Sequence, residues 1–172
     1  MKKILLLGYM GSGKSVIGKL MAKKLDILHY DLDNLIENHL QMSISEIFQQ
    51  KGELFFRKVE HQILNEFINK NETFVLSLGG GTPCYANNHL FLLSENVTSF
   101  YLNASIETLF SRLNTERSHR PLIADLNPEE FKEYIAKHLF DRSFYYNQAD
   151  FKVRVDNKTP EEITNEISLL LA

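Results

Sequence analysis

Short apolar runs alternate along the chain with longer stretches in which apolar residues recur every three or four positions. The near-continuous apolar runs lie at 3–7, 27–30, 74–78, 98–102 and 151–155. Runs of this length are typical of strands that are buried on both faces. The helical patterns between and after them lie at 14–25, 34–40, 44–50, 54–69, 88–94, 105–113, 127–145 and from 159 onward. Strands separated by helices predict an α/β fold of three layers, a five-stranded parallel sheet flanked by helices.

One segment, about 115–126, breaks this alternation. Its sequence, TERSHRPLIADL, is polar, contains Pro121 and two arginines, and lies between two helical patterns. These features predict a mobile loop. Neither an internal repeat nor a linker is evident, so we expect residues 1–172 to form a single domain.

Composition and charge narrow the class of partner. The 172 residues carry a formal net charge of −3 and include one cysteine, Cys84. The basic surplus typical of a nucleic-acid or anionic-membrane surface is absent, so small molecules are the expected partners. The first residues are too short an apolar run for a secretory signal, and no run approaches the roughly 18 apolar residues of a membrane span. We therefore expect a cytoplasmic protein.

The clearest motif follows the first strand. Residues 8–15 read GYMGSGKS and match the phosphate-binding pattern G-x-x-x-x-G-K-[ST] between a buried strand and a helix. In such a loop, backbone amides and the helix N-terminus surround the β-phosphate, and Lys14 supplies a positive charge to the β- and γ-phosphates. Ser15 is the expected Mg²⁺ ligand. A glycine turn that only caps a helix is the alternative, and the eight-residue match makes it the weaker interpretation.

Two carboxylates follow the second strand, at the sheet edge where ligands bind in open parallel sheets. Strand alternation would point Asp31 and Asp33 the same way. Asp31 is then placed to reach Mg²⁺ through water, and Asp33 to act as the base for an acceptor hydroxyl. The competing interpretation is that one of them simply caps the helix that follows.

Four arginines are candidates for binding anions. Arg57 and Arg142 each lie on a helical pattern, where a solvated surface charge is the ordinary expectation. If both line a pocket, their planar guanidinium groups suit a carboxylate. Arg117 and Arg120, in the expected mobile loop, are candidates for neutralising charge on the transferring phosphoryl group, although a solvated role remains open for Arg117.

Several segments together resemble the shikimate kinase family. They are GYMGSGKSVIG at 8–18, DLDNLIE at 31–37, ISEIFQQKGELFFRKVE at 44–60, SLGGG at 77–81, RPL at 120–122 and RSFYYNQAD at 142–150. The match covers most of the chain, and the 44–60 segment is not shared with phosphate-loop proteins in general. Family members differ in the segment between 112 and 127, and Thr82-Pro83-Cys84 departs from the varied small residues expected after the glycines.

This resemblance implies a nucleoside-monophosphate-kinase-like fold, with a substrate-binding helical region at about 32–61 and a lid at about 115–126. The implied reaction converts ATP and shikimate into ADP and shikimate 3-phosphate, a step in chorismate and aromatic amino-acid biosynthesis. Shikimate and ATP would be the ligands, Mg²⁺ the cofactor, and a monomer the expected state.

The resemblance also implies roles for individual residues. Those expected to take part in catalysis are Asp33, Lys14 and Arg120. Those expected to bind ATP are Gly11, Ser12, Gly13, Lys14, Ser15, Val16, Arg120 and Lys158. Those expected to bind shikimate are Asp33, Arg57, Gly79, Gly80, Gly81 and Arg142. Those expected to serve Mg²⁺ are Ser15 and, less directly, Asp31.

Two other functions remain to be weighed. A different small-molecule kinase, acting on gluconate or on a nucleoside monophosphate, would share the phosphate loop but not the combination of FFRKVE with the LGGG turn. A nucleotide-binding regulatory module without catalysis is a rival from another class, and the intact Lys14, Asp33 and Arg120 argue against it.

Overall fold

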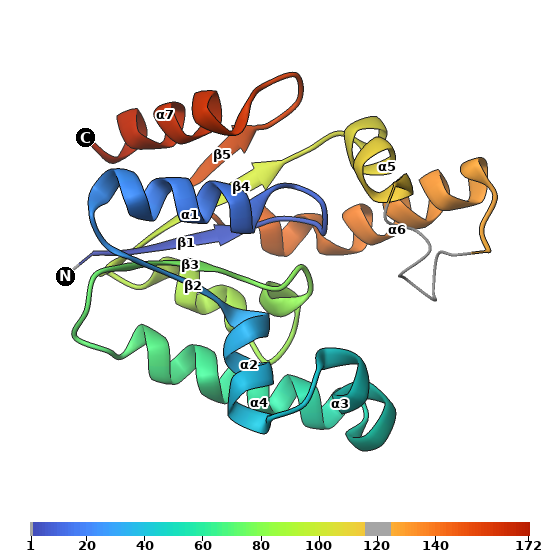
Figure 1. Ribbon diagram of the computed structural model, residues 1–172, viewed down its shortest axis with the longest axis horizontal. Coiled ribbons are helices and arrows are strands. Elements are labelled where there is room, and N and C mark those ends of the chain that lie inside the picture. Colours follow the sequence, from blue (N-terminus) through green and yellow to red (C-terminus); the bar gives the residue numbers. More distant parts are fainter. Residues whose placement is uncertain (1, 116–124) are drawn as a thin grey trace.

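The first strand forms the middle of the sheet. The computed structural model describes residues 2–115 and 125–172, and within them five parallel strands have the order β2-β3-β1-β4-β5 (Figure 1). Their bounds are β1 Lys3–Leu7, β2 Leu28–Asp31, β3 Phe74–Ser77, β4 Val97–Asn103 and β5 Phe151–Arg154. The α/β fold predicted from the apolar runs is confirmed, because all the strand pairs are parallel.

Helices cover both faces of this sheet (Figure 1). One face carries α1 (Lys14–Leu25), α5 (Ile106–Asn114) and α7 (Pro160–Leu171), and the other carries α2 (Leu32–Leu40), α3 (Ile44–Lys51) and α4 (Glu53–Ile68). The long helix α6 (Pro128–Tyr146) begins in the first layer and ends in the second, since Phe131 and Tyr146 belong to different apolar clusters. None of the helices in the described ranges is long and apolar enough to span a bilayer.

The alternation of β1 divides the apolar interior into two clusters. Ile4 and Leu6 pack with the α1, α5 and α7 side, whereas Leu5 and Leu7 pack with the α2, α3 and α4 side. Successive side chains of a strand point to opposite faces, so a strand covered on both sides must be apolar throughout. This explains why residues 4–7 form a continuous apolar run immediately before the loop at residues 8–13.

The segment predicted as a helix near 88–94 differs from a regular α-helix. It forms a 3₁₀ helix, η2 (Asn88–Leu93), after the short 3₁₀ turn η1 (Thr82–Cys84). Six residues offer too few hydrogen bonds for a stable isolated α-helix, and 3₁₀ geometry is common in such short connections. The other predicted elements are present, with bounds that differ from the prediction by at most two residues. Most of the expected lid at 115–126 lies outside the described residues.

Candidate functional site

The phosphate loop leaves the carboxyl end of β1 and runs directly into α1. Gly11 and Gly13 have φ values of 82° and 99°, in the left-handed region that favours glycine. Gly13 is the N-cap of α1, so the positive end of the helix dipole faces the loop. The Lys14 ammonium donates hydrogen bonds to the carbonyls of Gly8 and Tyr9, at 2.8 and 3.0 Å. The strand, loop and helix order that the motif requires is therefore present.

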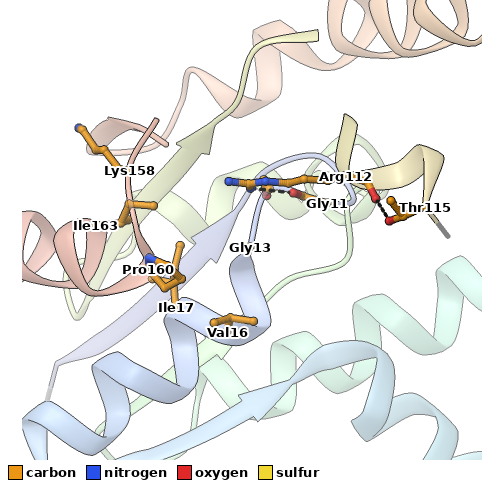
Figure 2. Close-up of a pocket in the computed structure, with 10 residues that line it drawn as sticks. Gly11, Gly13, Val16, Ile17, Arg112, Thr115, Lys158, Pro160 and Ile163 are labelled. Atoms are coloured by element: carbon orange, nitrogen blue, oxygen red, sulfur yellow. Dashed lines mark hydrogen bonds between the residues drawn. The ribbon is translucent and has the colours of Figure 1, made fainter. Parts of the chain in front are cut away.

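A cavity of about 480 Å³ opens on one side of the loop (Figure 2). Its lining combines the loop with α1, α5 and the beginning of α7: Gly11, Ser12, Gly13, Val16, Ile17, Arg112, Thr115, Lys158, Pro160 and Ile163. Figure 2 shows Arg112 extending over the loop from α5, while Pro160 and Ile163 come from the α7 side. Apolar walls with a few cationic groups suit a nucleotide, because its base is flat and its phosphates are anionic.

Arg112 was not identified from the sequence. Its Nη1 donates to the carbonyl of Gly11 at 3.0 Å, which fixes the guanidinium against the phosphate loop. The only sequence signal was its place at the end of a helix beside the expected mobile loop. Lys158, which the resemblance assigned to ATP, does line this cavity, and its ammonium pairs with Glu166 at 2.6 Å.

A second cavity of about 390 Å³ lies beyond the loop. It shares Gly11, Gly13 and Val16 with the first cavity. It adds further residues of the loop and α1 together with residues of β2, α2 and the end of β3: Met10, Lys14, Ser15, Asp31, Asp33, Leu78, Gly79 and Gly80. The two cavities thus meet at the phosphate loop. A phosphoryl group held by the loop would lie within reach of a ligand in the second cavity.

The two carboxylates line this second cavity, but not through strand alternation as predicted. Asp31 ends β2, and Leu32 already begins α2, so Asp33 lies in the first helical turn. Asp31 Oδ1 accepts a hydrogen bond from the amide of Asp33 at 3.1 Å, while Asp31 Oδ2 accepts one from the Ser15 hydroxyl at 2.7 Å. Asp31 therefore caps α2 and also contacts Ser15 of the phosphate loop. Capping the helix and lying beside a Mg²⁺ site, the two roles considered for Asp31, are thus compatible.

Asp33 has an unusual electrostatic environment. Burial and the neighbouring carboxylates of Asp31 and Glu60 together raise its pKa from 3.8 to about 6, against the opposing effect of Lys14. A carboxylate with a pKa near the working pH is suited to accept a proton from a hydroxyl.

The oxygen atoms beside the loop fit a magnesium ion. The Ser15 hydroxyl and the Asp31 carboxylate are hard oxygen donors held together by their 2.7 Å hydrogen bond. Mg²⁺ commonly binds one or two such protein groups and completes its shell with phosphate oxygens and water. Both residues line the cavity that adjoins Lys14.

Arg57 is not a solvated surface charge. Its side chain is 16% exposed, and its Nη1 pairs with the buried Glu60 at 2.9 Å, while Glu53 lies 3.4 Å from its Nε. The ring of Tyr85 stacks on the guanidinium at 3.9 Å. A Cβ at Gly81 would lie 2.8 Å from Arg57 Nη2, so a larger residue there would displace the guanidinium from its present position. Glu60 follows Arg57 by three residues in the sequence, and this R-x-x-E spacing is the signal that could have identified it as the partner of Arg57.

Arg142 is also half-buried and faces the glycine turn. Its guanidinium carbon lies 5.3 Å from the centre of the Tyr9 ring, and it hydrogen-bonds the hydroxyl of Tyr146. A Cβ at Gly80 would lie 3.2 Å from Arg142 Nη1. The structure thus gathers both predicted arginines around residues 79–81. Arg117 and Arg120 lie outside the described residues.

Comparisons with known proteins find similarity to shikimate kinases along nearly the whole chain. A family model described as shikimate kinase matches residues 10–172. A shikimate kinase of Flavobacterium johnsoniae is 54% identical over 172 residues, which is 100% of each chain. A second, from Flavobacterium psychrophilum, is 50% identical over 171 residues, 99% of each chain.

Solved structures show the same similarity in three dimensions. The crystal structure of shikimate kinase from Bacteroides thetaiotaomicron has a TM-score of 0.89 at 32% identity and covers 99% of this chain and 98% of its own. Shikimate kinase from Acinetobacter baumannii in complex with shikimate has a TM-score of 0.87 at 28% identity, over 99% and 93% of the two chains.

Proposed function

The chain belongs to the shikimate kinase family, and from this premise we propose that it transfers the γ-phosphoryl group of ATP to the 3-hydroxyl of shikimate. The observation that carries the assignment of residues is the meeting of two cavities at the phosphate loop, with Asp33 in the second cavity beside Lys14. ATP would occupy the first cavity and shikimate the second.

Shikimate binding is assigned to the arginines and the glycine turn. Shikimate carries a carboxylate and three hydroxyls, and the planar guanidinium groups of Arg57 and Arg142 suit that carboxylate. Glu60 pairs with one edge of Arg57 and so fixes the plane of the guanidinium. Gly80 and Gly81 allow the Arg142 and Arg57 side chains to approach the backbone closely, whereas Gly79 lies beside Asp33.

The chemical step is a direct transfer. The shikimate hydroxyl oxygen forms a bond to the γ-phosphorus, the bond from that phosphorus to the β–γ bridging oxygen breaks, and the hydroxyl proton passes to the Asp33 carboxylate. Lys14, now bound to loop carbonyls, would exchange these partners for phosphate oxygens and stabilise their negative charge. The helix N-terminus at Gly13 acts on the same phosphates.

The remaining ATP contacts follow from the first cavity. Residues 11–16 would surround the phosphates, and Arg112 with Lys158 would flank the base and ribose. Ser15 and Asp31 would hold Mg²⁺, which neutralises charge on the β- and γ-phosphates when bound. Arg120 is assigned, from the family resemblance alone, to charge neutralisation during transfer.

The biological setting is part of the same proposal. A reaction on shikimate places the protein in chorismate and aromatic amino-acid biosynthesis, with small molecules as its ligands. We propose a cytoplasmic monomer, which size-exclusion chromatography with light scattering tests directly.

The test is ADP production from Mg-ATP with shikimate, gluconate or AMP as separate acceptors. We expect turnover with shikimate alone and a phosphorylated product at the 3-position by ³¹P NMR. Turnover with gluconate or AMP and none with shikimate would overturn the proposal in favour of another small-molecule kinase. ATP binding without turnover on any acceptor would favour the regulatory module.

A further inference from the structure

A tyrosine within the phosphate loop points away from the phosphates. Tyr9 is 1% exposed, and its side chain lies against α6 and not in the first cavity. Its hydroxyl forms a 2.9 Å hydrogen bond with Nδ1 of His138. The cradle of such a loop is made by backbone amides, so the ring is not needed for binding phosphate. Its contacts therefore call for a different explanation.

Tyr9 contacts two successive turns of α6. His138 and Arg142 are four residues apart and so lie on the same face of the helix. The His138 bond holds the phenol at one end, and the Arg142 guanidinium carbon lies 5.3 Å from the ring centre. Burial and the charge of Arg142 lower the pKa of His138, which keeps the imidazole neutral beside the arginine.

The other side of Arg142 is held by a second phenol. The Tyr146 hydroxyl accepts from Arg142 and donates to the carbonyl of Gly80 at 2.6 Å. Tyr9 and Tyr146 thus orient the guanidinium through neutral groups. Its positive charge remains available to an anionic ligand beside Gly80, a residue that lines the second cavity, and the ring face adds a cation–π attraction.

We infer that Tyr9 is a positioning residue for Arg142, so that a side chain of the ATP-binding loop sets the affinity for shikimate. The inference rests on the proposed role of Arg142 in binding the shikimate carboxylate. The His138 hydrogen bond fixes the Tyr9 ring, and the ring fixes the plane of the guanidinium. A rotated guanidinium would lose the paired geometry that a carboxylate requires.

The test is steady-state kinetics of Tyr9→Phe and His138→Leu, each of which removes the hydrogen bond but keeps an apolar side chain. We expect the KM for shikimate to rise about two- to tenfold, the effect of one hydrogen bond. The KM for ATP and kcat should change less than twofold, although Tyr9 lies in the phosphate loop. His138→Asn, whose amide can occupy the position of Nδ1, should restore most of the shikimate KM.

A double-mutant cycle gives a sharper comparison. If both residues act through one bond, Tyr9→Phe with His138→Leu should be no worse than either alone. Tyr134→Phe is the matched control, because it removes a phenol hydroxyl from the same ring cluster without touching the Tyr9–His138 bond. Thermal unfolding of each variant shows whether the fold is intact.

Arg142→Ala distinguishes failure of the Tyr9 positioning role from failure of the proposed shikimate site. If Arg142→Ala raises the shikimate KM but Tyr9→Phe and His138→Leu leave it unchanged, the positioning role is overturned while the proposed function stands. A rise in ATP KM as large as the rise in shikimate KM would equally overturn it, since a disturbed phosphate loop would then explain the data. If Arg142→Ala itself leaves the shikimate KM unchanged, the proposed carboxylate site fails.

Discussion

Asp33 is the residue on which the proposed chemistry depends most directly. Its position beside Lys14, with a pKa near 6, suits a base that accepts the hydroxyl proton. We expect Asp33→Asn to lower kcat about 10²- to 10⁴-fold, the usual contribution of a positioned base. ATP affinity, measured by calorimetry, should change little because the phosphate loop is intact. An equal loss of ATP binding would contradict the role.

The same residue should reduce the stability of the ligand-free fold. A carboxylate whose folded pKa is raised binds protons more tightly in the folded state than in the unfolded state, so stability falls as pH rises from about 4 to about 6. Asp33→Asn removes this penalty. At pH 7 we expect the variant to gain on the order of 1–3 kcal/mol in urea unfolding. At pH 3.5 the gain should disappear, and a gain of equal size at both pH values would contradict the electrostatic explanation.

Arg57 offers a test of the acceptor site. Arg57→Ala removes a charge-assisted contact and should raise the shikimate KM about 10- to 100-fold, with little change in the KM for ATP. It also leaves the buried Glu60 with only the Thr82 hydroxyl as a described hydrogen-bond partner, so a lower melting temperature is expected. Lys58, the next residue, is exposed, and Lys58→Ala is the control. It should leave the shikimate KM and the melting temperature unchanged. An unchanged shikimate KM in Arg57→Ala would count against the carboxylate assignment.

At the scale of elements, one carboxylate joins two walls of the first cavity, the proposed ATP site. Asp156, after β5, accepts from the Ser105 amide at 2.9 Å and the Thr108 hydroxyl at 2.6 Å, both at the start of α5. Burial alone would raise the Asp156 pKa, but these hydrogen bonds and one from Arg154 hold it well below its usual range. Asp156 thereby holds α5, which carries Arg112, against the connection to α7.

Loss of this contact should affect the two substrates differently. We expect Asp156→Ala to raise the KM for ATP about 5- to 50-fold, because the donors of α5 lose their acceptor and the cavity wall shifts. The KM for shikimate should stay within twofold, since its proposed site lies beyond the loop. Asp156→Asn, which keeps one acceptor oxygen, should fall between wild type and alanine. A parallel rise in both KM values would indicate general loss of structure instead.

At the scale of the whole molecule, the two apolar clusters share one central strand. Leu5 and Leu6 are both 0% exposed but pack on opposite faces of β1. If residues 1–172 form one domain, Leu5→Ala and Leu6→Ala should each lower the free energy of unfolding by about 2–5 kcal/mol. Both should shift a single transition, followed by far-UV circular dichroism and by activity. Two transitions that respond separately would contradict the single-domain prediction.

The sequence alone determined the features that contiguous residues encode. Residues 8–15 specify a loop, its glycine conformations and the helix that follows, because all of these are local backbone properties. The apolar runs of β1, β3 and β4 specified the centre of the parallel sheet, since a strand buried on both faces is apolar, whereas the edge strands β2 and β5 are only partly buried. The positions of Asp33, Arg57 and Arg142 followed from motifs, although their surroundings did not.

Only the tertiary structure decided which distant residues meet. Arg112 contacts Gly11 across 101 positions, and Tyr9 contacts His138 across 129. No local pattern records such a pair, because the crossing of α5 and α6 over the loop depends on packing of the whole sheet. The same reason applies in part to the pKa of Asp33, which is raised by burial, by its neighbour Asp31 and by Glu60, a residue of another helix. Motifs thus located the candidate reactive groups along the chain, and packing gave these side chains their partners, their electrostatic surroundings and their orientation.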